Sequence, residues 1–325
     1  MMDDRRDRAL GAILGVLVGD ALGCGCHWYY DLEAFHRDYG PWVDNYVEPR
    51  PGRYHAGLPK GALSQTGQVT ALLLDSLAAL GRYDADDFGE RLDGLLATLD
   101  GTPKSGRYTD KAMRDVWRNR RDGRPWGEAG SLAETAEAAI RSTVLAAALA
   151  DRPSELARIA LANIRLTHAD PFIAVQALAF CLTVASLIQG GDLATASRNA
   201  KSWIEDLDAA APAIDCFLQP GGVQRAAETL APQIQPPTAV ALVYGMPCQQ
   251  GMLLPAAYWW ATQFASDFET AVLTAVNSGG NNMARAALTG ALVGARTGRR
   301  GIPKRFLAGL EDSARLQATA ERVVG

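Results

Sequence analysis

Apolar residues recur at helical spacing through most of the chain, in stretches rich in alanine and leucine. The clearest stretches cover residues 69–80, 136–150, 171–189 and 267–277. The sequence lacks runs rich in Val, Ile, Thr and aromatic residues that alternate strictly over five or more positions, as a half-buried strand would. The pattern predicts an all-α fold. Residues 39–60 collect prolines, glycines and aromatic residues, and they predict a long surface loop over a cleft.

Small residues repeat at every fourth position in two stretches, one near each end of the chain. The first row is Gly11, Gly15, Gly19 and Gly23, and the second is Ala286, Gly290, Gly294 and Gly298. A glycine inside a helix costs roughly 1 kcal/mol relative to alanine, and close approach of two packed helix backbones offsets that cost. We therefore expect the two ends of the chain to pack together, although alanine-rich helices also collect small residues by chance.

Composition narrows the class of protein. The 325 residues are 48% hydrophobic, enough for a sizeable core, and 32 Lys and Arg against 36 Asp and Glu give a net charge of −4. This charge offers no general attraction to nucleic acid or to an acidic membrane, so neither is an expected partner. The N-terminal residues show no export signal, and no run of about 18 residues avoids polar groups. We expect a cytoplasmic enzyme or binding protein whose partners are small molecules or other proteins.

The five cysteines predict free thiols in a reducing compartment. Only Cys24 and Cys26 lie close together, at a spacing that fits neither a zinc knuckle nor a redox pair. Their position beside His27 raises the alternative of a thiol nucleophile, which would need a lowered thiol pKa.

Three segments, in this order, resemble the ADP-ribosylglycohydrolase family. Residues 11–23 (GAILGVLVGDALG) resemble its glycine-rich opening, residues 166–171 (LTHADP) its T-H-x-x-P element, and residues 275–303 its A-V-N-x-G-G-D-T-D-T element with the small-residue helix that follows. The resemblance covers nearly the whole chain. It implies one domain over residues 1–325, an orthogonal α-helical bundle, and a cleft in which related enzymes hold two magnesium ions beside an ADP-ribose.

The chain departs from the family at both acidic elements that supply the magnesium ligands. The first element, Thr-Asp-Asp in the family, reads Ser64-Gln65-Thr66-Gly67-Gln68, and the second reads Asn281-Asn282-Met283-Ala284 after Gly279-Gly280. Magnesium prefers oxygen ligands and usually needs one or two carboxylates, whereas amides and hydroxyls offer only neutral oxygens. We therefore expect no metal cofactor here. The polar residues at these two elements remain the predicted substrate contacts: Ser64, Gln65, Thr66, Gln68, Gly279, Gly280, Asn281 and Asn282.

Two further positions differ from the family or match it only in part. His27 stands where the family commonly has a glutamate, four residues after the G-D-A-L-G stretch, and Arg141 is retained from an N-G-x-x-M-R element that here reads AEAAIR. An imidazole with an ordinary pKa of about 6.5 suits acid-base chemistry, so His27 is a catalytic candidate, although a packed, hydrogen-bonded histidine is an alternative. Asp20 is the second catalytic candidate, with a structural anchor as the alternative for this buried acid.

Two more sites have a structural alternative. His168 belongs to the T-H-x-x-P element and is expected, with Arg141, to contact substrate, unless it only orients its loop. Asp170 and Pro171 predict an N-cap and the first residue of a helix. The backbone N–H groups of residues 279–281 precede a helix and suit a diphosphate or a carboxylate, but a tight turn capped by Asn281 would use the same donors.

Three functions follow from this sequence. The first is a metal-independent hydrolase that acts on a ribosyl or other glycosidic bond, a hypothesis weakened by the lack of an obvious carboxylate pair. The second is an inactive relative, a pseudoenzyme, that binds ADP-ribose, a nucleotide or a sugar. The third is a structural or interaction protein that has kept only the fold. The expected partner is a small ribosyl, nucleotide or sugar-like ligand, and a protein substrate is compatible with the same site.

Overall fold

The structure, a computed structural model, describes residues 2–104, 107–204 and 234–325. These residues form helices and no strands, with only isolated bridges between Tyr29 and Gly280 and between Ser131 and His168. The helices are α1 (Met2–Gly25), α2 (Leu32–Tyr39), α3 (Gln65–Leu80), α4 (Ala85–Leu96), α5 (Lys111–Arg121), α6 (Glu137–Leu149), α7 (Pro153–Arg165), α8 (Pro171–Ile188), α9 (Leu193–Ile204), α12 (Val240–Tyr244), α13 (Gln250–Gln263), α14 (Phe268–Val276), α15 (Asn282–Thr297), α16 (Lys304–Gly309) and α17 (Ser313–Val323). The all-α prediction is confirmed.

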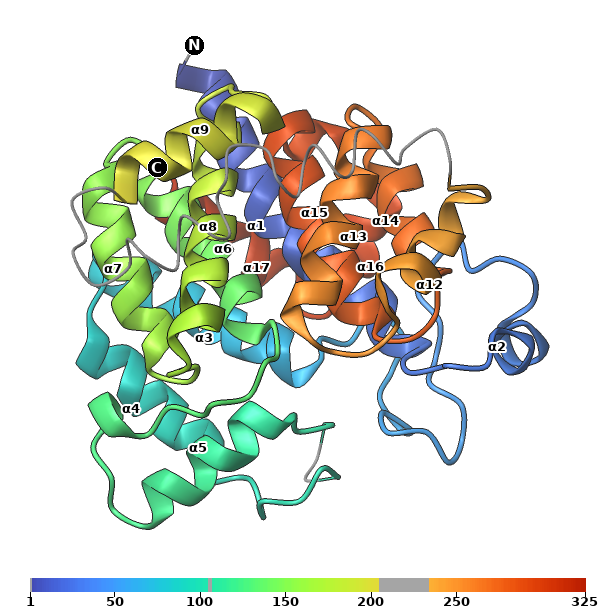
Figure 1. Cartoon of the computed structure of the whole chain (residues 1–325), viewed down its shortest axis with the longest axis horizontal. Coiled ribbons are helices and arrows are strands. Elements are labelled where there is room, and N and C mark those ends of the chain that lie inside the picture. The colour runs from blue at the N-terminus through green and yellow to red at the C-terminus, as the bar shows by residue number, and fades with distance from the viewer. Residues whose placement is uncertain (1, 105–106, 205–233) are drawn as a thin grey trace.

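Helices α1 and α15 lie side by side in the middle of the bundle (Figure 1). A Cβ added to Gly15 would lie 2.2 Å from the carbonyl oxygen of Gly290, and one added to Gly294 would lie 2.1 Å from that of Gly11. The two rows of small residues therefore form one seam in which helix backbones touch. The expected packing of the two ends of the chain is confirmed.

The other helices surround this central pair. Helices α6 and α8 pack on one side and α13 and α14 on the other, while α4 and α5 lie below the bundle, as seen in Figure 1. The stretches Asp4–Gly25 in α1 and Pro171–Ile188 in α8 are long and apolar enough to cross a membrane, with mean hydropathies of 1.4 and 2.1. The sequence analysis had found no run of about 18 residues without polar groups. Both are largely buried inside the bundle, so they are core helices.

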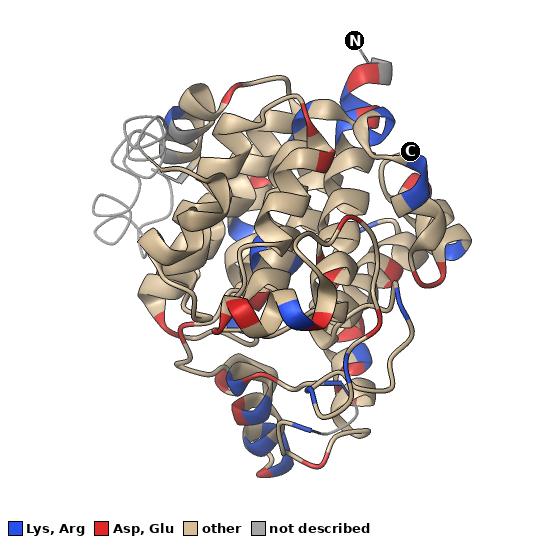
Figure 2. Cartoon of the chain, turned by 90° about the vertical axis from the view of Figure 1, so that its right-hand side faces the viewer, with Lys and Arg blue, Asp and Glu red and all other residues tan. Residues whose placement is uncertain are grey.

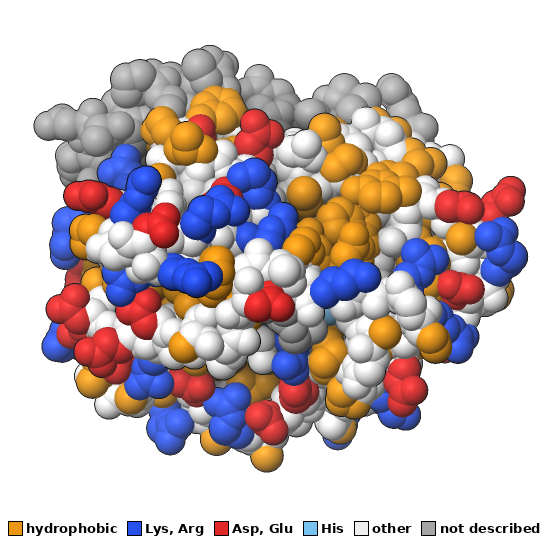
Figure 3. Space-filling view, turned by 90° about the horizontal axis from the view of Figure 1, so that it is seen from below, with side chains coloured by type: hydrophobic (Ala, Val, Ile, Leu, Met, Phe, Trp, Pro, Cys, Tyr) orange, Lys and Arg blue, Asp and Glu red, His pale blue; other side chains and the backbone are white. Residues whose placement is uncertain are grey.

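Charged residues lie mostly on helices at the periphery of the bundle and on the helices below it (Figure 2). The lower face mixes apolar patches with charges of both signs (Figure 3). This face therefore presents no extended area of a single charge.

Several helices begin at capping residues that the sequence makes recognisable. Asp170 accepts hydrogen bonds from the backbone N–H groups of Phe172 and Ile173, with Pro171 as the first residue of α8, as predicted. Ser64 caps α3, which starts at Gln65 rather than at residue 69. The polar segment 64–68 consequently forms the first turn of α3, where its side chains are held by helical geometry.

Candidate functional site

The two elements that replace the family's acidic residues meet His27 at one small cavity of about 50 Å³. Five of the residues singled out in the sequence line it: His27, Ser64, Gln65, Thr66 and Asn281. The N-terminal ends of four helices, α3, α5, α6 and α15, contribute to its wall. Helix N-termini carry partial positive charge, so the wall suits anionic or hydroxyl-rich groups.

The first rewritten element is tied to the rest of the protein by hydrogen bonds. Asp20 accepts the backbone N–H of Ser64 at 2.8 Å and its hydroxyl at 2.6 Å, and the Gln65 amide donates to the Thr109 hydroxyl at 2.9 Å. Burial raises the pKa of Asp20 to about 6, against the opposing effect of the two bonds from Ser64. Asp20 does not line the cavity. These contacts favour the anchor interpretation, because both carboxyl oxygens are used to hold α3 on α1.

The second rewritten element forms the corresponding clamp on α15. Asn281 caps this helix by accepting the N–H of Ala284 at 3.2 Å. Asn282 donates its amide to the carbonyl of Val276 at 3.0 Å, and its amide oxygen lies 3.2 Å from Nδ1 of His27. This orientation assigns the ring proton of His27 to Nδ1 and leaves Nε2 as an acceptor.

His27 is a cavity residue but a poor base. The ring is buried, stacked on Trp28 at a centroid distance of 5.0 Å, and burial lowers its pKa to about 3, with His55 adding to the effect. The imidazole is therefore neutral at pH 7. A proton from water would be held only weakly, which weakens the expected general-base role and leaves hydrogen bonding through Nε2.

Two of the three backbone donors expected to bind an anion are already used. The N–H of Gly280 donates to the carbonyl of Tyr29, and that of Asn281 donates to the carbonyl of Met246 at 2.8 Å. Gly279 and Gly280 adopt φ values of +69° and +56°, which favour glycine in this tight turn. The capped-turn alternative accounts for this segment, and neither glycine lines the cavity.

Gln68 faces away from the cavity. It lines a different groove, between α3, α4 and α17, together with Leu72, Arg91 and Arg315. Gln65 and Thr66 line the cavity, whereas Gln68 does not, although it lies only three positions after Gln65 on the same helix. The structure therefore separates Gln68 from the other predicted substrate contacts.

Arg141 and His168 lie behind the cavity wall. Arg141 is fully buried and donates to Asn163 and to the Thr167 hydroxyl at 2.7 Å, and the Thr167 hydroxyl lies 2.9 Å from Nδ1 of His168. Nε2 of His168 lies 3.1 Å from the Thr135 hydroxyl and 3.4 Å from Oε2 of Glu137. His168 therefore contacts two residues that line the cavity, Arg141 is linked to it through the Thr167 hydroxyl, and neither Arg141 nor His168 lines the cavity itself.

The cavity contains two carboxyl groups that were not predicted from the sequence. Asp110, the N-cap of α5, and Glu137, the first residue of α6, both line it. Burial and the neighbouring Glu137 raise the pKa of Asp110 well above its ordinary value. The sequence hypothesis of a glycosidase without a carboxylate pair is corrected on this point. The signal was weak because the two residues are far apart in sequence, and only the capping position of Asp110 stands out.

Aromatic and imidazole rings of the 39–60 loop close the cavity from outside. His55 and Tyr54 lie on this loop, and Tyr54 packs against Tyr108 at 4.9 Å and Trp28 at 6.0 Å between ring centroids. His55 is buried, its pKa is lowered to about 4 by burial, and neither ring nitrogen has a hydrogen-bond partner among the described residues. The predicted loop over a cleft is therefore present, and it brings a second histidine to the cavity.

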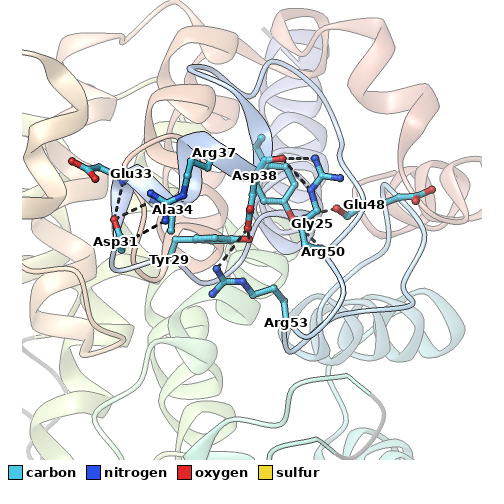
Figure 4. Close-up of polar contacts among 11 residues, drawn as sticks. Gly25, Tyr29, Asp31, Glu33, Ala34, Arg37, Asp38, Glu48, Arg50 and Arg53 are labelled. Atoms are coloured by element: carbon cyan, nitrogen blue, oxygen red, sulfur yellow. Dashed lines mark hydrogen bonds and ion pairs between the residues drawn. The ribbon is translucent and has the colours of Figure 1, made fainter.

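A polar cluster joins the loop to α2 and to Tyr29, which lies between α1 and α2 (Figure 4). The Arg53 guanidinium lies 3.6 Å from the centroid of the Tyr29 ring, and the Tyr29 hydroxyl donates to Asp38. Arg53 also pairs with Asp38 at 3.7 Å, and Arg50 donates to the backbone carbonyl of Asp38 at 3.0 Å. Through these contacts α2 holds the segment that carries Tyr54 and His55.

The thiols do not form a nucleophilic site. The four described cysteines are free, and Cys24 and Cys26 are buried. Burial raises the pKa of Cys24 well above its ordinary value and that of Cys26 to about 12, the opposite of what a thiolate nucleophile needs. The fifth cysteine, Cys216, lies outside the described residues.

The residues at the two family elements do not fit a magnesium pair. Their side chains are hydroxyls and amides, and most of these are engaged in the protein hydrogen bonds described above. Among the described residues, no group of three or more His, Cys, Asp or Glu side chains could hold a metal ion. No carboxylate at either element is present to compensate for dehydration of a strongly hydrated dication.

Comparison with known proteins decides the family. The model of the ADP-ribosylglycohydrolase family matches residues 1–325. The chain belongs to the ADP-ribosylglycohydrolase family. A solved structure named "ADP-ribosylglycohydrolase-related protein complex" is similar over 99% of this chain and 98% of its own, with a TM-score of 0.67 and 23% identity. That likeness supports the orthogonal helical bundle. No curated protein sequence gives a significant match.

Proposed function

We propose that this family member is a hydrolase that cleaves a ribosyl or other glycosidic bond, in a small molecule or an ADP-ribosylated substrate, without a resident pair of magnesium ions. One observation carries the proposal. The family's acidic positions hold hydroxyls and amides that are bonded within the protein, while imidazole, hydroxyl and carboxyl side chains line the cavity between them. The chemistry available there is proton transfer and hydrogen bonding to hydroxyls.

Binding without turnover is the second candidate function. It is favoured by the two imidazoles in the cavity, because burial lowers the pKa of His27 to about 3 and that of His55 to about 4. The enclosed volume of about 50 Å³ is also far below the ~300–1,000 Å³ of typical ligand pockets, so a nucleotide must either shift the loop or bind only in part. A protein with this site would hold a ribosyl or sugar-like ligand and release it unchanged.

The two candidates are separated by calorimetry followed by a turnover assay. ADP-ribose is titrated into the protein in the presence of Mg²⁺ and again in the presence of EDTA, and the same two buffers are used with ADP-ribosylated peptide substrates. We expect equal affinity and equal turnover in both buffers. Affinity or turnover that requires Mg²⁺ would refute metal independence. Equal binding without turnover would establish the second candidate, and no binding in either buffer would refute both.

Two substitutions on α3 locate the bound ligand. Thr66→Val removes a hydroxyl from the cavity wall, and Gln68→Ala is the matched control, because Gln68 lines the groove on the other side of the helix. Weaker binding of ADP-ribose is expected in the first variant and unchanged binding in the second. The opposite order would mean that the ligand occupies the groove lined by Gln68.

The expected location and partners belong to the same proposal. A cytoplasmic hydrolase acting on a small ligand or a modified protein agrees with the net charge of −4 and with free cysteines among the described residues. Neither nucleic acid nor a membrane is proposed as a partner.

A further inference from the structure

We propose that Asp110 and Glu137 form a carboxyl pair that shares one proton and serves as general acid and general base in the cavity. The inference rests on the proposed function and names the two residues that would move protons in it. Neither residue belongs to the sequence elements in which the family carries its magnesium ligands.

The geometry leaves one oxygen of each carboxyl free for chemistry. Oδ1 of Asp110 accepts the N–H of Met113 at 2.6 Å and caps α5, while Oδ2 is buried and has no hydrogen-bond partner among the described residues. Oε2 of Glu137 is buried and makes no hydrogen bond in the same sense, although Nε2 of His168 lies 3.4 Å away. Glu137 begins a helix that has no side-chain cap. Carboxylate oxygens only accept hydrogen bonds, so these two oxygens can pair with each other only when one carries a proton.

The surrounding charges favour a single proton on the pair. Burial lowers the pKa of Arg141 to about 10, so its guanidinium remains charged at pH 7, and burial lowers the pKa of His168 to about 4, which leaves that ring neutral. Lys111 lines the same cavity, but its ammonium pairs with Asp115 at 2.5 Å, and that carboxylate balances its charge. Arg141 is then the buried cation that interacts with both carboxyls. The buried cluster is electroneutral when the pair carries one negative charge and one proton.

His55 is an independent sign that this cavity receives a ligand. The ring is 1% exposed and lines the same cavity, and both of its nitrogens lack a partner among the described residues. A buried polar side chain without a partner is unfavourable, because it has lost its hydration without a replacement. A ligand hydroxyl, or water held where that hydroxyl would bind, satisfies the ring and lies within the same small space as the carboxyl pair.

The proposed step uses the pair as one unit. Asp110 donates its proton to the leaving-group atom as the bond between that atom and the anomeric carbon breaks, and the bonding electrons stay with the leaving group. A water molecule adds its oxygen to the anomeric carbon and gives a proton to the Glu137 carboxylate. The products are the protonated leaving group and a sugar with an anomeric hydroxyl. Transfer of the proton from Glu137 to Asp110 restores the starting state.

The spacing of the two carboxyls bears on which group attacks. Retaining glycosidases separate nucleophile and acid by about 5–5.5 Å, and inverting ones separate acid and base by about 6.5–9.5 Å to leave room for a water molecule. Asp110 and Glu137 are close enough to share a hydrogen bond in the ligand-free protein, so an entering sugar must separate them before either reaction. The proposed step uses the wider separation, in which water attacks and no covalent sugar–enzyme intermediate forms.

The experiment compares the full-length wild type with Asp110→Asn and Glu137→Gln. Asparagine caps helices about as well as aspartate, so the first variant keeps the start of α5. Asp84→Asn is the matched control, since Asp84 caps α4 at the surface, outside the cavity. We expect each cavity variant to retain ADP-ribose affinity within a few fold and to lose turnover by on the order of 10²–10⁴, as for removal of a general acid or base. The control should be unchanged.

A second readout tests the shared proton without turnover. Infrared spectroscopy of the ligand-free protein at pH 7 should show a protonated-carboxyl band that disappears in Asp110→Asn and shifts in Glu137→Gln. Wild-type turnover that survives in both variants, or absence of the band, would refute the pair. Loss of the band on addition of Mg²⁺, with faster turnover, would make the carboxyls metal ligands and overturn the inference. Absence of wild-type turnover would instead refute the proposed function together with this role.

Discussion

Gly290→Ala should destabilise the protein even though alanine is the better helix former. The added Cβ would lie 2.1 Å from the carbonyl oxygen of Gly15 and 2.8 Å from its carbonyl carbon. Carbon and oxygen atoms at ordinary contact need more than 3 Å, so α1 and α15 must move apart by about 1 Å. The obstacle is backbone, and no side-chain rotation relieves it.

The magnitude follows from two opposing effects. Overpacking a close-packed core costs about 1–3 kcal/mol and occasionally more, and a displaced helix pair loses dispersion contacts along the whole seam. Higher helix propensity returns roughly 1 kcal/mol. We expect a net loss of about 2 kcal/mol or more in the free energy of unfolding. The same displacement separates His27, beyond the end of α1, from Asn282 on α15, so ligand affinity should fall as well.

The measurement is urea-induced unfolding followed by circular dichroism, which reports the transition midpoint and its slope. Gly94→Ala in α4 is the matched control, because a Cβ at that position meets nothing within 4 Å. This control should be as stable as the wild type or more stable by up to ~1 kcal/mol. A Gly290→Ala protein as stable as the Gly94→Ala protein would refute backbone contact along the seam.

Three further predictions concern the cavity and its supports. Asp20→Asn should flatten the pH dependence of stability. In the wild type, the pKa of Asp20 in the folded state, about 6, exceeds its ordinary value of 3.8, so the folded state binds a proton more tightly than the unfolded state does. The free energy of unfolding should therefore fall by about 3 kcal/mol as pH rises from about 4 to above 6. Unfolding at several pH values would show it, and an unchanged slope in the variant would contradict it. His27→Gln should leave the shape of the pH profile of turnover unchanged between pH 5 and 8, because the pKa of His27, about 3, lies below that range. Loss of one limb of the profile in the variant would show that His27 does act as a base. Ser64→Ala should lower the free energy of unfolding by about 1–3 kcal/mol, because it leaves a buried Asp20 oxygen without its hydrogen-bond donor. Urea unfolding would measure the loss, with the conservative Ser64→Thr as the control. An alanine variant as stable as the wild type would show that Asp20 is not an anchor.

Much of the fold could be predicted because its information is local. Helical spacing of apolar residues marked α6, α8 and α14 almost to their ends, and Asp170 with Pro171 marked the start of α8. The small-residue rows predicted a long-range contact as well. Glycine repeated on one helix face has a single strong physical use, which is to let another backbone approach.

The candidate site was predictable only in part. The sequence identified His27, Ser64 and Asn281 as polar residues at rewritten family positions, and all three line the cavity. Their hydrogen-bond partners were not predictable, because Asp20 and Asn282 are brought to them by contacts between distant segments. The pKa of His27 followed the same rule: burial, not residue type, lowered it to about 3.

Only the tertiary structure placed Asp110 beside Glu137 and brought His55 above them. The two carboxyls begin different helices, and the histidine lies on an irregular loop, so no spacing in the sequence relates the three. Likewise, only the tertiary structure shows that the N–H groups of Gly280 and Asn281 donate to the carbonyls of Tyr29 and Met246. It also shows that Gln68 lines a different groove from Gln65 and Thr66. Helix formation and the glycine seam depend on periodicity along one chain segment, which the sequence contains. Burial, charge pairing and the allocation of hydrogen bonds depend on which segments meet, and that was decided by packing.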